Sequence, residues 1–129
     1  MNMRMSREEF EECAQQAFDA LPDAFQKKVD NVQIVVEDYP DSDLSKELRT
    51  GKYSLLGLYT GIPLPHRNTW YGTSPTVPDR IYLFQKNIES QCTTRDQLRN
   101  RITEVLLHEL GHYFGMNEAE VRRALKEYE

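Results

Sequence analysis

The chain has 129 residues, of which 39% are hydrophobic and 29% charged, and its formal net charge is -5. This length allows one domain and is too short for two well-formed cores, and the composition is that of a folded protein rather than a disordered one. The acidic balance argues against non-specific binding to nucleic acid, which needs clustered Lys and Arg, and no apolar run approaches the roughly 20 residues of a membrane span.

The N-terminal quarter of the chain is predicted to be helical and to lead into a strand. Ser6 and Glu9 have the spacing of a capping box, and apolar residues then recur at helical intervals, so a first helix is expected over residues 7–20. Pro22 can open a second short helix. The β-branched run Val32–Asp38 predicts the first strand.

The middle of the chain is predicted to hold two further strands separated by a long loop. Residues 44–49 suggest a helical turn, and Tyr53–Gly61 is predicted to be a strand. Gly57 inside that strand indicates a bulge or a close approach by another part of the protein. Residues 62–79 hold four prolines and are read as a loop of the length that is usually functional or mobile. The alternating segment Arg80–Gln85 predicts the third strand.

Two helices are expected in the last third of the chain. Thr93 or Thr94 can cap the longest helix, which should run to about Phe114. A final helix should follow Asn117, which forms a second capping box with Glu120. The chain shows no repeat and no linker, so residues 1–129 are expected to form a single α+β domain with a small sheet.

The two cysteines, Cys13 and Cys92, are far apart and lack the CxxC spacing of thiolate metal sites and redox motifs. Both are interpreted as small buried hydrophobic residues in a reducing compartment. The N-terminal segment turns acidic at once and has no apolar signal region. A cytoplasmic location is therefore expected.

One stretch of the long helix, HELGHYFGMNE, has the spacing of a metal site. His108 and His112 stand four residues apart, so both rings project from one face and can close on a single ion. On a helical wheel they lie at the edge of the apolar arc, where a cleft would run. Zinc takes neutral imidazole nitrogen at about 2.0–2.1 Å and suits three protein ligands plus water in a catalytic site. Glu109 lies about 100° round the helix, where it can take a proton from that water without being a ligand.

The glycines of this stretch suggest how a third ligand is supplied. Gly111 costs about 1 kcal/mol in mid-helix against alanine, which suggests close backbone packing. Gly115 stands where the helix should end and can take the left-handed C′ conformation. A turn there would bring back Glu118 as the third ligand. In the alternative without a metal, the two histidines are solvated edge residues and Glu118 is the favourable first-turn acid of the last helix.

These residues resemble a known family. HELGHYFGMNE fits the pattern HExGHxxGxxE of a small bacterial zincin-like metallopeptidase family, and the segments LLGLYTGIPLPHR and PDRIYLFQKNIE are also similar to it. The resemblance implies a minimal zincin-like fold, in which a small mixed sheet of about three strands packs with an N-terminal helix, the HExxH helix and a C-terminal helix. It implies one Zn²⁺ on His108, His112 and Glu118, with Glu109 as general base, and hydrolysis of a peptide or protein substrate.

A peptidase also needs a group that stabilises the oxyanion, and the sequence offers several candidates without selecting one. His66 and Arg67 lie in the long loop and could cover the metal, although a plain surface role is slightly favoured for them. Trp70 and Tyr71 could form a substrate wall or anchor the loop. The remaining tyrosine candidates are Tyr59 and Tyr113, the first of which is expected to pack in the core or at the strand edge.

Two other functions remain open from sequence. A family of ribosomal-RNA maturation enzymes has three histidines at the same offsets, but here Glu109 follows the first histidine and the third position is an acid, which disfavours a ribonuclease. The chain could also be a zincin scaffold that binds or regulates without catalysis, since fold does not fix function. Manganese, cobalt or nickel could replace zinc at such a donor set. A peptidase in the cytosol is expected to have narrow specificity or low activity.

Overall fold

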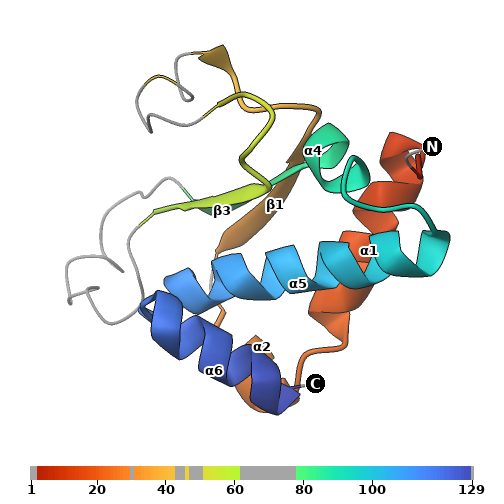
Figure 1. Cartoon of the computed structure of the whole chain (residues 1–129). Coiled ribbons are helices and arrows are strands. Elements are labelled where there is room, and N and C mark those ends of the chain that lie inside the picture. Colours follow the sequence, from red (N-terminus) through yellow and green to blue (C-terminus); the bar gives the residue numbers. More distant parts are fainter. Residues whose placement is uncertain (1–2, 30, 43–45, 47–50, 62–77, 129) are drawn as a thin grey trace.

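The computed structural model describes residues 3–29, 31–42, 46, 51–61 and 78–128 (Figure 1). None of the helices in these ranges combines the length and apolar composition that a membrane span requires. The expected α+β class with a small mixed sheet is confirmed. In chain order the elements are α1 (Arg7–Asp19), α2 (Asp23–Gln26), β1 (Val32–Glu37), β2 (Gly57–Thr60), β3 (Asp79–Phe84), α4 (Gln85–Glu89), α5 (Arg95–Tyr113) and α6 (Glu118–Tyr128).

The helix starts follow the capping signals of the sequence. The backbone N–H of Glu9 donates to Ser6 Oγ at 3.1 Å, and that of Gln97 donates to Thr94 Oγ1 at 3.1 Å. Each side chain satisfies a backbone donor that has no partner within the first helical turn. Both predicted starts are therefore confirmed, with Thr94 as the cap of α5. Pro22 precedes α2 as its N-cap residue instead of opening it.

The sheet has the order β1-β3-β2, with β1 parallel and β2 antiparallel to the central strand β3. The predicted strand Tyr53–Gly61 is wrong in its first half, because only Gly57–Thr60 is extended and paired. The Asn87 side chain of α4 donates to the carbonyls of Lys52 and Leu55, at 2.9 and 2.7 Å. A hydrogen bond from Ser54 N–H to the carbonyl of Gly51 closes a turn in the same segment.

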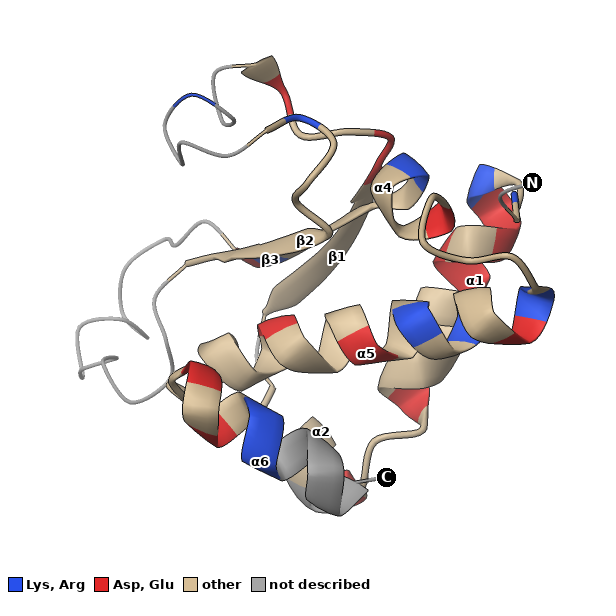
Figure 2. Ribbon diagram, in the orientation of Figure 1, with Lys and Arg blue, Asp and Glu red and all other residues tan. Residues whose placement is uncertain are grey.

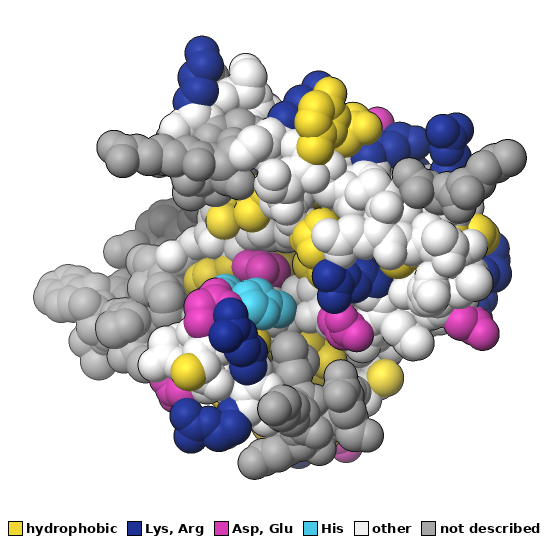
Figure 3. Space-filling view, in the orientation of Figure 1, with side chains coloured by type: hydrophobic (Ala, Val, Ile, Leu, Met, Phe, Trp, Pro, Cys, Tyr) yellow, Lys and Arg dark blue, Asp and Glu magenta, His cyan; other side chains and the backbone are white. Residues whose placement is uncertain are grey.

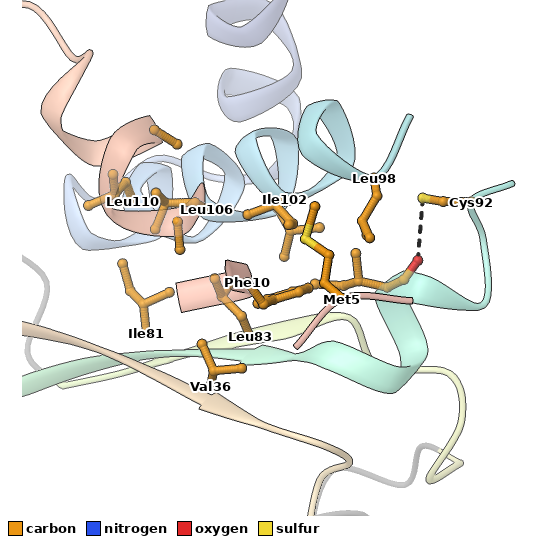
Figure 4. Packing of buried hydrophobic residues seen from close by; sticks show 14 of the residues in the cluster. Met5, Phe10, Val36, Ile81, Leu83, Cys92, Leu98, Ile102, Leu106 and Leu110 are labelled. Atoms are coloured by element: carbon orange, nitrogen blue, oxygen red, sulfur yellow. Dashed lines mark hydrogen bonds between the residues drawn. The ribbon is translucent and has the colours of Figure 1, made fainter. Parts of the chain in front are cut away.

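Helix α5 lies between the sheet and α6, and it contacts α1, α6, β2 and β3 (Figure 1). The apolar arc predicted for this helix is buried against side chains of α1 and of one sheet face, as Figure 4 shows from close by. This packing leaves the histidine side of α5 at the edge of the core. The buried residues include Phe10 and Ala14 of α1, Val36, Ile81 and Leu83 of the sheet, and Leu98, Ile102, Leu106 and Leu110 of α5.

Charged residues of both signs are scattered over the described elements. In the view of Figure 2, basic positions on α1, α4, α5 and α6 alternate with acidic ones, and no element in that view is uniformly basic. The predicted helical turn at residues 44–49 falls outside the described residues apart from residue 46. The predicted loop at residues 62–79 is described only from residue 78, and β3 already begins at Asp79.

Candidate metal centre

The C-terminal half of α5 presents His108 and His112 to the same side, one turn apart. Their ring centroids are 5.0 Å apart, and the side chains are 31% and 30% exposed. Glu109, between them in sequence, is buried, with 8% of the residue exposed. Donor atoms of these three residues lie within 4.8 Å of one another. The structure therefore brings together the three residues of the predicted HExxH pattern at the rim of the core.

The chain reverses direction after α5 through a glycine turn. Gly115 has a φ of 82°, and its N–H donates to the carbonyl of His112 at 2.9 Å, while Met116 N–H donates to the carbonyl of Gly111 at 3.0 Å. This pair of bonds is a Schellman motif, and its left-handed residue is sterically easy only for glycine. The predicted helix stop at Gly115 is thus confirmed.

Helix α6 then starts from a reciprocal capping box. Glu120 N–H donates to Asn117 Oδ1 at 2.9 Å, and Asn117 N–H donates to Glu120 Oε1 at 3.2 Å. The predicted second capping box is therefore present. It fixes the first residue of α6, Glu118, directly beside the histidines.

The Glu118 carboxylate faces both imidazole rings. One of its oxygens, Oε1, lies 3.0 Å from His112 Nε2 and 3.3 Å from His108 Nε2, and Oε2 lies 3.2 Å from His108 Nε2. Donors held tetrahedrally at about 2.0–2.1 Å from zinc are roughly 3.3 Å apart. The distance from each of the two nitrogens to the carboxylate is therefore close to that between neighbouring donors in such a site.

The two ring nitrogens of His112 contact different groups, Nδ1 a backbone carbonyl and Nε2 the Glu118 carboxylate. His112 Nδ1 is 3.3 Å from the carbonyl oxygen of Met116, which can only accept a hydrogen bond. In the tautomer that carries hydrogen on Nδ1, this contact is a hydrogen bond and the lone pair of Nε2 faces Glu118 Oε1 at 3.0 Å. That lone pair is the one that a metal ion would use. A backbone carbonyl that fixes the tautomer in this way is a common partner of metal-bound histidine.

Glu109 is held from the opposite side by the sheet. Burial raises the pKa of its carboxyl above the usual value, while the neighbouring His108 and His112 and a hydrogen bond from the backbone N–H of Tyr59 lower it. Phe84 N–H donates to the carbonyl of Leu56, so these two residues form a hydrogen-bonded pair of the antiparallel ladder. Because hydrogen-bonded and non-hydrogen-bonded pairs alternate along such a ladder, the main-chain groups of Gly57 and Tyr59 point away from β3. Strand β2, the edge strand of the described sheet, thereby orients the carboxylate.

Gly57 allows this edge to lie close to α5. A Cβ at residue 57 would be 2.7 Å from Val105 Cγ1, 3.0 Å from the carbonyl oxygen of Tyr82 and 3.3 Å from Glu109 Cγ. Of the two interpretations of Gly57, a bulge or a close approach, the structure shows the close approach.

The tyrosine candidates for oxyanion stabilisation are engaged elsewhere. Tyr59 donates its hydroxyl to Asp79 Oδ2 at 2.6 Å, and Tyr113 is fully buried with its hydroxyl donating to the carbonyl of Lys28 at 3.1 Å. The expected packing role of Tyr59 is confirmed. The loop candidates His66, Arg67, Trp70 and Tyr71 all lie outside the described residues.

A cleft of about 370 Å³ opens beside Glu109, between α5 and the segment that leads into β2. In the space-filling view of Figure 3, histidine, acidic and hydrophobic side chains lie together in a hollow on this face. The cleft is lined by Leu55, Leu56 and Gly57 on one side and by Arg101, Glu104, Val105, His108 and Glu109 on the other.

Comparison with known families agrees with this arrangement. The family model described as zincin-like metallopeptidase matches residues 29–127, which is more than three quarters of the chain. The chain belongs to the zincin-like metallopeptidase family. No curated protein sequence matches it. Membership implies a zinc cofactor and a hydrolase of the metallopeptidase type, and the donors grouped on α5 suit such an ion.

Three contributors to the site were missed by sequence reasoning. They are the Tyr59 N–H, the Met116 carbonyl and the cleft wall formed by Leu55 and Leu56. The first two are main-chain groups, which every residue type carries, so no sequence pattern marks them. The only available signal was Gly57, whose missing side chain indicated that another part of the chain comes close.

Proposed function

We propose that the chain is a zinc-dependent peptidase in which His108, His112 and Glu118 hold the ion and Glu109 is the general base. The observation that carries the proposal is the Glu118 carboxylate, which lies 3.0–3.3 Å from the Nε2 atoms of two histidines on another helix. Bound among these donors, zinc would supply a Lewis acid that acidifies water and polarises a carbonyl group. The protein's own contribution is to fix three donors and one base around that position.

The roles of the two glutamates follow from their surroundings. The Glu118 side chain is 55% exposed and turned to both rings, as a ligand requires. Glu109 is mostly buried, is anchored by the Tyr59 N–H and borders the cleft. One oxygen of Glu109 can hold that hydrogen bond while the other receives a proton from water, which suits a general base.

The edge of β2 gives a peptide a place to lie. The main-chain groups of Gly57 point away from β3, and Gly57 lines the cleft, where an extended chain can add as a further strand. Such pairing would carry the scissile carbonyl past Glu109. The same edge supports the peptidase proposal over the ribonuclease alternative, together with the net charge of -5.

The test combines zinc content with peptide cleavage in protein purified without chelators. The wild type and Glu109→Gln should each hold about one zinc per chain, whereas His112→Ala and Glu118→Gln should hold much less. Cleavage should fall by about 10²–10⁴-fold in Glu109→Gln, since general bases contribute that much. Glu12→Gln, at an exposed position of α1, is the control and should keep both zinc and activity.

The outcomes separate the proposal from its rivals. Full turnover in Glu109→Gln would show that Glu109 is not the general base. Full zinc content in Glu118→Gln would show that Glu118 is not the third ligand. A biological effect that persists in Glu109→Gln would establish the binding-module alternative instead.

A further inference from the structure

The cleft beside Glu109 has two chemically different compartments. The nearer one is walled by the aliphatic side chains of Leu55, Leu56 and Val105. The farther one, of about 350 Å³, is lined by the amide side chains of Gln91, Gln97 and Asn100 and by Cys92. Arg101 and Glu104 border both compartments, so the two adjoin along one side of α5.

An ion pair forms the partition between the compartments. Arg101 Nη1 donates to Glu104 Oε2 at 2.9 Å, while its Nε and Nη2 donate to Gln91 Oε1 at 2.9 and 2.6 Å. Gln91 lies in the connection between α4 and α5, so the guanidinium is held from two elements. The opposite wall is also fixed, because Asn87 binds the carbonyl of Leu55.

We propose that the aliphatic compartment is a specificity subsite for a branched aliphatic side chain next to the scissile bond, and that the amide-lined compartment holds the polar continuation of the same peptide. This inference rests on the proposed peptidase function. Eleven residues of α5 separate Gln97 from His108, which spans about 16 Å at 1.5 Å per residue. An extended peptide of about five residues covers that length at roughly 3.3 Å per residue.

Charge and shape together favour an aliphatic side chain in the nearer compartment. An acidic side chain there would lie between Glu104 and Glu109. The arginine among the lining residues, Arg101, is already paired to Glu104. A basic side chain would share Glu104 with Arg101 and would bring a charged group to the aliphatic wall, where removing it from water is costly. Leucine or valine covers that wall without a charge, and even one methylene in such a pocket changes binding by about 10–200-fold.

The experiment uses peptide hydroxamates, whose hydroxamate group binds zinc and places one variable side chain beside it. Affinities for the zinc-loaded protein are measured with leucine, glycine, aspartate and lysine at that position. The leucine compound should bind at least about tenfold more tightly than the other three. Leu55→Ser should remove most of that preference and leave the affinity of the glycine compound unchanged.

Leu58→Ser is the matched control, because Leu58 is another half-buried leucine but lines a separate groove with Thr60 and Tyr82. It should keep the leucine preference. Arg101→Ala removes the partition and should raise the affinity for a side chain longer than leucine, such as homophenylalanine. Leu55→Ala provides the same comparison if the serine variant does not fold.

Different results overturn different parts. Protein that binds zinc but shows equal affinities for all four compounds, or a leucine preference that survives Leu55→Ser, overturns the subsite and leaves the proposed peptidase intact. If Arg101→Ala keeps the wild-type preference for side-chain length, the ion pair is not a partition between the two compartments. Protein that takes up no zinc overturns the proposed function and the subsite together.

Discussion

Gly111 on α5 lies directly against Val121 on α6, so closely that a Cβ at residue 111 would be 2.6 Å from Val121 Cγ2. Val121 is 1% exposed and belongs to the same helix as Glu118. The spacing between the histidine helix and the glutamate helix is therefore set by a residue without a side chain. A glycine in mid-helix predicted close packing at residue 111, and the structure identifies Val121 as its partner.

Substituting Gly111 should separate the two helices. Gly111→Ala gains about 1 kcal/mol of helix propensity but overpacks the contact, which typically costs about 1–3 kcal/mol. We expect weaker zinc binding in a chelator competition assay, because Glu118 moves away from the rings. The double variant Gly111→Ala/Val121→Ala relieves the overlap and should recover much of the affinity. Equal affinities in the wild type and the single variant would show that the contact does not position Glu118.

The turn at Gly115 should be sensitive to any side chain. Gly115 has a φ of 82°, and the left-handed conformation costs an L-residue about 1–2 kcal/mol. Gly115→Ala should lower the free energy of unfolding by that amount in urea titrations. Gly51→Ala is the control, since Gly51 is exposed and a Cβ there would lie 3.2 Å from the hydroxyl of Ser54, an exposed side chain that can rotate away. A loss of equal size in both variants would contradict a special role of the Gly115 turn.

Asn87 should hold the apolar wall of the cleft in place. Asn87→Ala removes the donor that binds the carbonyls of Lys52 and Leu55, and a hydrogen bond of this kind contributes about 0.5–1.5 kcal/mol. Hydrogen exchange at residues 52–56 should become faster. Ser90→Ala, which removes only the hydroxyl that donates to the Asn87 carbonyl, should leave this exchange nearly unchanged. Unaltered exchange in Asn87→Ala would show that the wall is held by other contacts.

The two cysteines should differ in reactivity. Burial raises the pKa of the Cys92 thiol, Arg101 lowers it, and Glu104 and Glu89 raise it, with a net rise. The thiolate is the reactive form, so Cys92 should be alkylated slowly in the folded protein, whereas the half-buried Cys13 should react first. Mass spectrometry after limited treatment with iodoacetamide would show which site is modified.

The same shift has a consequence for stability at alkaline pH. Because the folded pKa of Cys92 is raised, its contribution to stability is present below the unfolded value of about 8.5 and is lost as pH rises above it. Cys92→Ala should therefore lose less stability between pH 8 and pH 10 than the wild type does. An identical pH dependence in the two proteins would contradict this assignment.

Local signals in the sequence predicted the helix ends and the buried face of α5. The side-chain cap at Ser6, the capping box at Asn117, the glycine stop at Gly115 and the apolar arc of α5 depend on neighbouring residues, and all four are present. Short-range hydrogen bonds and helical periodicity act over a few residues, so they can be read from one sequence.

Long-range contacts set the limit of that prediction. The first half of the predicted strand Tyr53–Gly61 is bound by Asn87, more than thirty residues away, and no local pattern marks this. The anchoring of Glu109 by Tyr59 is likewise a main-chain contact across 50 residues. Such contacts depend on how the elements pack, and the cleft between α5 and β2 arises from the same packing.

The Schellman turn and the capping box at the start of α6 are made entirely by the protein, and together they place Glu118 beside the two rings. The proposed cage is thus preorganised, unlike that of a zinc finger, whose chain is unfolded without its metal. Adding zinc to chelated protein should therefore leave the far-ultraviolet circular dichroism spectrum almost unchanged. Ion uptake would then be a local event, and which metal is loaded would depend mainly on its supply in the cell.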